Sequence, residues 1–445
     1  MRLYASEIAA VANGRLHGED GAFDGASIDS REVGGGHLFV AIVAERDGHD
    51  FVPAAVASGA AAVLSDRPLD VEVPVVEVAD TMAGLAAAGR LARTCLPDRV
   101  VGVTGSVGKT SVKDLTASVL DTTFAVAASE RSFNNELGVP LTLLNAPAAT
   151  SAAVVEMGAR GAGHIADLCA IATPTIGVVT AVAAVHTELF GTLADVARAK
   201  GELVEALPSD GFAVLNGDDP AVAAMADRTD ATVLTYGDRG DVRATAVELD
   251  AELRPRFVLH VEDRQQPVRL AVRGRHNVDN ALAAAAVGHV CGLDLETIAL
   301  GLGQAALSPW RMELHRVATG GTVINDAYNA NPTSMRAALD SLASLAADRR
   351  IAVLGVMGEL GDDSDAAHRQ VADYAGRLGI EVIAVEAPTY GPDVVHVASV
   401  DDAHDRVAPV RSGTAVLVKA SRAAGLERLA GKLAAPDGGA AGRRG

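Results

Sequence analysis

A glycine-rich segment around residue 105 has the residue types of a phosphate-binding loop. Glycines let backbone N–H groups reach phosphate oxygens, and Gly-Lys-Thr adds a cation and a hydroxyl ligand for Mg²⁺. The usual loop, G-x-x-x-x-G-K-[ST], would require glycine at position 103, where Val103 stands. A tight strand-to-helix turn is the alternative, but the strand expected before the segment and the helix expected after it favour phosphate binding. The sequence predicts a shortened loop of Gly105, Ser106, Val107, Gly108, Lys109, Thr110 and Ser111.

Two further polar residues follow apolar segments typical of buried strands. Glu156 ends Ala-Ala-Val-Val-Glu, and His186 follows the apolar run that starts at Thr175. In an open parallel sheet, ligands bind beyond the carboxyl ends of the strands, so both side chains are expected near the phosphate loop. A carboxylate at this position can bind Mg²⁺. The alternatives are a helix-capping role for Glu156 and a hydrogen-bonded core position for His186.

Lys200 falls within the apolar face of a predicted helix. Val196 and Leu203 belong to the same stripe at helical spacing. A lysine in such a stripe can extend its ammonium group to solvent. The alternative is chemical, because burial favours the neutral amine, which can react with CO₂ to form an anionic carbamate. A carbamylated Lys200 could then hold a second Mg²⁺ together with His186.

Four polar residues farther along the chain could contact a nucleotide. Asn277 and Asn280 share one face at the start of a predicted helix, where asparagine can read an adenine edge or simply cap the helix. Arg311 and Asp326 flank a predicted strand. Arginine suits a γ-phosphate and a strand-end aspartate suits ribose hydroxyls, although a surface ion pair would also explain them.

The elements that must position these residues fall into three successive α/β regions. Region 1–97 mixes short strands with a helix-like segment over 52–64. Region 98–307 alternates apolar strands and helices, which predicts a parallel sheet, and a period-two segment near 241–272 predicts a small antiparallel insertion. Region 308–445 repeats the strand–helix alternation and predicts a Rossmann-like unit. The predicted fold class is therefore α/β with three domains.

Bulk composition restricts the function further. The formal net charge of −19 argues against nucleic acid as a partner, while backbone amides and a lysine can still bind a small anion. The cysteines, Cys95, Cys169 and Cys291, form no C-x-x-C pair and suggest no disulfide framework, zinc site or redox cofactor. The sequence has no apolar run of membrane-spanning length and no signal-peptide pattern, so a cytoplasmic protein without stable membrane insertion is expected.

Several motifs together resemble the Mur ligases, the ATP-dependent amide-forming enzymes of peptidoglycan synthesis, over essentially the whole chain. The short phosphate loop at Thr104–Ser111 has the form found in that family. Other similar segments are SFNNELGVPLTLLN, VVEMGARGAGHI, RGRHNVDNALAA, NDAYNANPTSM and VLGVMGELG. The pairing of Asn134-Asn135-Glu136 with Tyr328-Asn-Ala-Asn331-Pro332 is most similar to members that join D-alanyl-D-alanine to UDP-N-acetylmuramoyl-tripeptide.

The resemblance implies roles for individual residues. Lys109, Thr110 and Glu156 would hold the ATP phosphates and Mg²⁺, and His186 with carbamylated Lys200 would support a second ion. Asn280 would contact adenine, Asp326 the ribose and Arg311 the phosphate end. An N-terminal UDP-binding domain, indicated by IDSR and DGHDF, would contact the UDP-sugar through Ser30 and Arg31. The candidates for peptide binding are Asn134, Asn135, Tyr328, Asn329 and Asn331.

The implied enzyme is a monomeric bacterial ligase that uses ATP and has two further substrates, the UDP-tripeptide and the dipeptide. A sister ligase that adds a single amino acid is the nearest alternative. Folate-polyglutamate ligases share the central loop but lack the IDSR and DGHDF segments. The sequence departs from the family pattern at Val356, Gly358, Ala181 and Ala420, and the departures at Val356 and Ala181 also admit a nucleotide-binding regulatory protein with a decayed active site. The retained Lys109, Glu156 and Lys200 argue for the enzyme.

Overall fold

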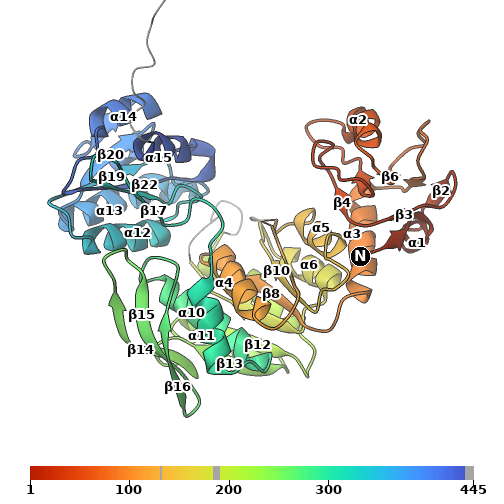
Figure 1. Cartoon of the computed structure of the whole chain (residues 1–445), viewed down its shortest axis with the longest axis horizontal. Helices are drawn as coiled ribbons and strands as arrows, with labels where there is room; N and C mark the ends of the chain where they lie inside the picture. The colour runs from red at the N-terminus through yellow and green to blue at the C-terminus, as the bar shows by residue number, and fades with distance from the viewer. Residues whose placement is uncertain (131–132, 184–190, 436–445) are drawn as a thin grey trace, which may run out of the picture.

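Three large β-sheets, each covered by helices, organise the chain. The structure is a computed structural model that describes residues 1–130, 133–183 and 191–435. In Figure 1 the N-terminal domain (red and orange) and the C-terminal domain (blue) lie on opposite sides of a central domain. The predicted α/β class with three domains is confirmed. No helix in the described ranges combines the length and apolar character needed to cross a membrane.

The N-terminal domain is built on a five-stranded sheet. Its strands, in spatial order, are β2 (Arg15–His17), β7 (Val75–Glu77), β6 (Ala62–Ser65), β5 (Leu38–Val40) and β4 (Ala26–Ser27). β1 (Leu3–Tyr4) pairs with β3 (Ala22–Phe23), and the helices are α1 (Ala5–Val11), α2 (Val52–Ala57) and α3 (Thr81–Thr94). The helix predicted over 52–64 is therefore wrong in its second half. The chain turns at Gly59, with φ of +98°, and Ala62-Val-Leu-Ser65 then enters the sheet as β6, where all of its residues are buried.

Helix α3 joins the N-terminal domain to the central one through a shared core. A Cβ atom on Gly89 would lie 2.5 Å from Cβ of Pro140 in α5 (Gly138–Leu144), so only glycine permits this approach of the two helices. Arg93 of α3 is almost fully buried and donates to the carbonyl oxygens of Ala172 and Thr173 at 2.9 and 3.3 Å. Both domains consequently belong to one hydrophobic cluster.

The central domain contains a nine-stranded sheet in the order β16-β15-β14-β13-β12-β11-β8-β10-β9. The predicted strands are present as β8 (Val100–Thr104), β10 (Ala152–Glu156), β11 (Ile176–Val179), β12 (Phe212–Asn216) and β13 (Thr232–Tyr236), with β9 (Val126–Ala128) at one edge, and all are parallel. The predicted antiparallel segment continues the same sheet as β14 (Val242–Leu249), β15 (Pro255–Val261) and β16 (Arg264–Arg269). The helices that bear on function are α4 (Lys109–Asp121), α6 (His164–Ala172), α8 (Leu193–Glu205), α10 (Asn277–Val290) and α11 (Leu295–Gln304).

The C-terminal domain has a six-stranded sheet that is parallel except at one edge. Its order is β17 (Glu313–Arg316), β18 (Thr322–Asn325), β22 (Thr414–Lys419), β19 (Arg349–Leu354), β20 (Glu381–Val385) and β21 (Val395–Val397). β17 runs antiparallel to β18. The main helices are α12 (Pro332–Ser344), α13 (Ser364–Arg377), α14 (Val400–Val407) and α15 (Glu427–Ala434). Segments that follow the carboxyl ends of β18, β19 and β22, together with the segment before β17, provide the residues that this domain contributes to the site described next.

Candidate active site

The phosphate loop connects β8 to α4 and depends on glycine at two positions. Gly105 has φ of +144° and Gly108 has φ of +85°, values that side-chain-bearing residues rarely adopt. A Cβ atom on Gly105 would overlap with Oγ1 of Thr180, and one on Gly108 would lie 2.7 Å from Oδ1 of Asn280. The helix begins at Lys109, so its free N–H groups face the loop. The predicted shortened loop therefore has the geometry that phosphate binding requires.

The segment after β11 holds the loop in place. The backbone N–H of Ser106 donates to the carbonyl of Ala181 at 2.7 Å, and Ala183 N–H donates to Oγ of Ser106 at 3.0 Å. Thr180 donates from Oγ1 to the carbonyl of Val107 at 2.5 Å. Thr180 is a site residue that sequence reasoning missed. The available signal was its position directly after an apolar strand, the same signal that identified Glu156.

Lys109 and Glu156 come together at the carboxyl ends of neighbouring strands. Glu156 is opposite Val103 in the register of β10 and β8, and it is only 1% exposed. Nζ of Lys109 donates to the carbonyl of Gly105 at 2.9 Å. Desolvation lowers the pKa of Lys109, and the charge of Glu156 opposes this shift. The structure therefore places Lys109 and Glu156 close together, as the sequence predicts.

One carboxylate oxygen of Glu156 accepts a hydrogen bond and the other has no partner among the described residues. Oε1 accepts a hydrogen bond from Nδ2 of Asn134 at 2.8 Å, whereas Oε2 is buried without a hydrogen-bond partner among the described residues. A buried carboxylate oxygen with no partner is costly unless a cation or donor meets it. The described residues contain no cluster of three or more His, Cys, Asp or Glu side chains that could hold a metal by themselves. Mg²⁺ fits because it needs only one or two protein ligands, here Glu156 and Thr110, when phosphate oxygens and water supply the rest.

Lys200 is buried in α8, as its place in the apolar stripe predicts. Its exposed fraction is 2%, and burial, followed by the nearby charge of Lys109, lowers its pKa to about 7. At neutral pH a substantial share of the side chain is therefore the neutral amine that can react with CO₂. Its predicted partner, His186, lies outside the described residues.

A cleft of about 530 Å³ runs from the phosphate loop to the C-terminal domain. It is lined by every residue of the predicted loop except Gly105, and by most of the other predicted nucleotide and peptide contacts. These lining residues are Ser106, Val107, Gly108, Lys109, Thr110, Ser111, Asn134, Glu156, Asn277, Asn280, Arg311, Asp326, Tyr328, Asn329 and Asn331.

The two asparagines at the start of α10 have different surroundings. Asn277 is fully buried, donates from Nδ2 to the carbonyl of Arg273 at 2.6 Å, and accepts at Oδ1 from Nδ2 of Asn280 at 2.7 Å. The side-chain amide of Asn277 is thus engaged at both ends and orients Asn280. Asn280 lies beside Gly108 and remains the better placed of the two to contact a base.

The backbone on either side of Arg311 is locally strained. Trp310 and Met312, on either side of Arg311, have φ of +62° and +51°. Non-glycine residues adopt such angles at a cost, which concentrates at functional sites. The guanidinium of Arg311 stacks on the ring of Tyr328 at 4.2 Å, while its Nε has no partner among the described groups. 

Asp326 is already engaged by the protein. Its Oδ2 accepts from Nζ of Lys419 at 2.5 Å, and its Oδ1 accepts from the N–H of Met312 at 3.0 Å. Lys419, like Arg422, lines the cleft and was missed by sequence reasoning. The signal was again positional, because Lys419 ends the apolar strand β22 beside Asp326.

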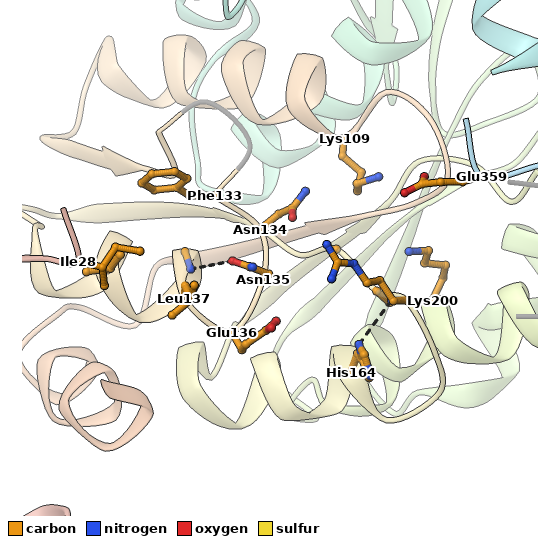
Figure 2. Close-up of a pocket in the computed structure, with 15 residues that line it drawn as sticks. Ile28, Lys109, Phe133, Asn134, Asn135, Glu136, Leu137, His164, Lys200 and Glu359 are labelled. Atoms are coloured by element: carbon orange, nitrogen blue, oxygen red, sulfur yellow. Dashed lines mark hydrogen bonds between the residues drawn. The ribbon is translucent and has the colours of Figure 1, made fainter. Parts of the chain in front are cut away.

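A second cavity, of about 450 Å³, adjoins the first and extends toward the N-terminal domain. Figure 2 shows Lys109 and Glu359 directed toward each other at one end of it, and Ile28 of the N-terminal domain at the other. Asn134, Asn135 and Lys200 also line it. Lys109, Asn134 and Glu359 line both cavities, so they mark the place where the two spaces meet.

Some predicted substrate residues have other observed roles. Ser30 and Arg31 line neither of these two cavities, and Arg31 forms an exposed ion pair with Asp29. Asn331 is the N-cap of α12, where its Oδ1 accepts from Ser334 N–H at 2.9 Å. Helix capping is the ordinary use of asparagine at this position. Glu359 was quoted within a family motif but not recognised as a site residue.

Comparison with known proteins agrees with this architecture domain by domain. The family models described as Mur ligase family catalytic domain, Mur ligase middle domain, and Mur ligase glutamate ligase domain match residues 23–91, 103–288 and 310–422. The UDP-N-acetylmuramoyl-tripeptide--D-alanyl-D-alanine ligase of Mycobacterium tuberculosis is 43% identical, over 92% of each chain. The chain belongs to the Mur ligase family.

Solved structures of Mur ligases have the same arrangement of domains. MurF from Acinetobacter baumannii is 30% identical, with a TM-score of 0.88 over 97% of this chain and 99% of that one. The MurF ligase from Thermotoga maritima, solved in complex with ADP, is 27% identical, with a TM-score of 0.81 over 92% of this chain and 96% of that one. Use of ATP by a Mur ligase of this kind is consistent with the glycine loop, Lys109 and the cleft beside them.

Proposed function

We propose that this Mur ligase joins D-alanyl-D-alanine to UDP-N-acetylmuramoyl-tripeptide with ATP as the energy source. The observation that carries the proposal is the meeting of two cavities at Lys109, one beside the phosphate loop and one reaching the N-terminal domain. This geometry suits the transfer of a phosphoryl group from a nucleotide in one cavity to a carboxylate that arrives through the other. The activity for which the 43% identical mycobacterial relative is named supports the choice of substrates.

The chemistry explains why both cavities are needed. A carboxylate does not condense with an amine in water, because its oxygen is a poor leaving group. Transfer of the γ-phosphoryl group to the carboxylate gives an acyl phosphate, which the amine of the dipeptide attacks to form the amide and release phosphate. Lys109 and the N–H groups of the loop stabilise the negative charge that develops on the transferred group. Bound Mg²⁺ supplies further charge neutralisation at the phosphates.

The roles of the other residues follow from their places in the cleft. Thr110 and Glu156 hold the first Mg²⁺, Asn134 orients Glu156, and Asn280 contacts adenine with Asn277 supporting it. Arg311 contacts the phosphate end of the nucleotide, and Asp326 contacts the ribose. Asn135, Tyr328, Asn329 and Asn331 lie along the path of the peptide, and Ser30 and Arg31 contact the UDP-sugar.

A second Mg²⁺ belongs to the same proposal. Carbamylation converts Lys200 from a buried cation into an anion that can bind the ion, and His186 completes this part of the site. The lowered pKa of Lys200 supports the reaction with CO₂. The proposed enzyme is a monomer, and residues of one chain line both cavities. Since ATP and UDP-linked precursors are cytoplasmic metabolites, the proposed reaction takes place in the cytoplasm.

Phosphate release tests the proposed function directly. The purified protein is expected to release phosphate only when ATP, UDP-N-acetylmuramoyl-tripeptide and D-alanyl-D-alanine are all present. Mass spectrometry of the product is expected to show the mass of the pentapeptide precursor. Parallel reactions with single amino acids provide the control, because a sister ligase would use one of them. Phosphate release that is indifferent to the dipeptide would contradict the assignment.

A further inference from the structure

We infer that Arg160 and Glu136 together bind a free amino-acid head group on the third residue of the acceptor peptide. Such a head group carries an ammonium and a carboxylate on one carbon, as the far end of diaminopimelate does. Lysine has a side chain of the same length that ends in the ammonium alone. The inference deepens the proposed function and rests on it, because it names the acceptor that the enzyme selects.

Both residues line the cavity of about 450 Å³ through which the acceptor is proposed to reach Lys109, and neither lines the nucleotide cleft. Glu136 lies in the segment before α5, and Arg160 lies in the segment between β10 and α6. In Figure 2, Glu136 and His164 lie on the side of the cavity opposite Phe133 and Lys109. A peptide residue that presents one carboxylate to Lys109 can therefore extend its other end toward Glu136 and Arg160.

The charges of Glu136 and Arg160 are available to a ligand. Both side chains are exposed at the cavity wall. Among the described residues, neither side chain takes part in a hydrogen bond or an ion pair, and the two do not pair with each other. A zwitterionic head group satisfies both charges, because its carboxylate accepts from the guanidinium and its ammonium donates to the carboxylate. A lysine side chain would satisfy Glu136 and leave the guanidinium without an anion.

The loop that carries Arg160 is held at both ends. At its start, the N–H of Gly158 donates to the carbonyl of Asn134 at 2.7 Å. At its end, a carboxylate oxygen of Glu202 in α8 accepts from the N–H of Gly163 at 2.6 Å. A fixed backbone reduces the conformational entropy that is lost when the guanidinium binds a ligand. The loop therefore suits a residue that distinguishes one acceptor from another.

Two acceptors that differ by a single carboxylate test the inference. These are UDP-N-acetylmuramoyl-tripeptides whose third residue is meso-diaminopimelate or L-lysine. We expect the wild-type enzyme to have a kcat/KM at least about tenfold higher for the diaminopimelate acceptor, mostly through KM, as one charged hydrogen bond predicts. A wild-type enzyme that prefers the lysine acceptor, or uses both equally well, would overturn the inference.

Single substitutions identify which residue reads which charge. Arg160→Gln is expected to lower kcat/KM about 10- to 100-fold for the diaminopimelate acceptor and less than about threefold for the lysine acceptor. Glu136→Gln removes the partner of the ammonium that both acceptors carry, so its effect is expected to be similar for the two. Arg198→Gln changes an exposed arginine of α8 outside both cavities, and this matched control is expected to behave as wild type.

The possible failures of these experiments are distinguishable. An equal loss for both acceptors in Arg160→Gln would assign Arg160 to a carboxylate that the two tripeptides share, and would overturn the inference. A preference for diaminopimelate that is unchanged in Arg160→Gln would overturn it as well. Thermal unfolding of each variant shows whether a loss of activity comes from misfolding. If the wild-type enzyme released no phosphate with either acceptor in the presence of D-alanyl-D-alanine, the proposed function itself would fail.

Discussion

Asn134 donates a hydrogen bond from Nδ2 to Oε1 of Glu156 at 2.8 Å, and Glu156 lines the phosphate-binding cleft. Asn134 lies in the segment before α5, and Glu156 ends β10. The bond fixes the rotation of the carboxyl group, so the oxygen without a partner among the described residues has a defined direction. This relationship explains how a single buried carboxylate can contribute to a Mg²⁺ site.

Substitutions of Asn134 and of Glu156 are expected to weaken Mg²⁺ binding to different degrees. Asn134→Ala removes the orienting bond, and partners of metal ligands usually contribute about 10- to 100-fold to metal affinity. We expect the Mg²⁺ concentration for half-maximal activity to rise within that range and activity to recover at high Mg²⁺. Glu156→Gln removes the ligand itself and should not recover. Nucleotide affinity without Mg²⁺ is the control, and an Asn134→Ala enzyme with unchanged Mg²⁺ dependence would contradict this reading.

Lys200 provides a chemical-rescue experiment. Lys200→Ala removes the side chain that carbamylation would convert into an anion, so ligase activity is expected to fall by at least about 100-fold. Short carboxylates such as acetate or propionate can occupy the space and replace the lost negative charge, and they are expected to restore part of the activity. Chloride at equal ionic strength is the control. Full activity of the variant without any carboxylate would leave Lys200 with a structural role alone.

The buried lysine also predicts a pH dependence of stability. Burial lowers the pKa of Lys200 from 10.5 to about 7, so between these values the folded protein binds fewer protons than the unfolded chain. The penalty to folding is therefore full below pH 7 and disappears as the pH rises to 10.5. Each pKa unit corresponds to about 1.4 kcal/mol. Lys200→Met should raise the melting temperature at pH 6, and the gain over wild type should shrink toward pH 10.

The control for this measurement is a lysine that remains in water. Lys432 of α15 is half exposed, so Lys432→Met should change the melting temperature much less at pH 6. The measurements require CO₂-free buffer, because a carbamate would change the charge of Lys200 in the wild type. If Lys200→Met raised the melting temperature equally at pH 6 and pH 10, the titration of Lys200 would not be the cause of the pH dependence of stability.

Two glycine substitutions can separate the effect of steric overlap in the phosphate loop from the effect of an unfavourable φ angle alone. Gly105→Ala introduces both an unfavourable φ and an overlap with Thr180, whereas Gly163→Ala introduces only the unfavourable φ, since no atom lies within 4 Å of its Cβ position. Overpacking of this kind costs about 1–3 kcal/mol. We expect ATP affinity to fall about tenfold or more for Gly105→Ala and to stay near wild type for Gly163→Ala, as measured by calorimetry. Equal affinities in both variants would mean that the contact with Thr180 does not shape the nucleotide site.

The sequence by itself determined the features that depend on local pattern. The phosphate loop, the strand-end position of Glu156 and the burial of Lys200 all follow from short-range rules, because backbone geometry and helical or strand periodicity act over a few residues. The order of α/β regions was determined in the same way. The helix predicted over 52–64 was wrong beyond Gly59, because a short apolar run such as Ala62-Val-Leu can form a buried strand as well as part of a helix.

Only the tertiary structure decided which residues meet across domains. Glu359 faces Lys109, and Thr180 donates a hydrogen bond to Val107. Asn277 uses both the nitrogen and the oxygen of its side-chain amide in hydrogen bonds to neighbouring residues, while Asn280 lies beside Gly108. Such pairings depend on how sheets and helices pack after they form, and no periodicity within one segment encodes them. The physical reason is that chemistry at the cleft arises from the ends of separate elements, whose positions are fixed by long-range packing.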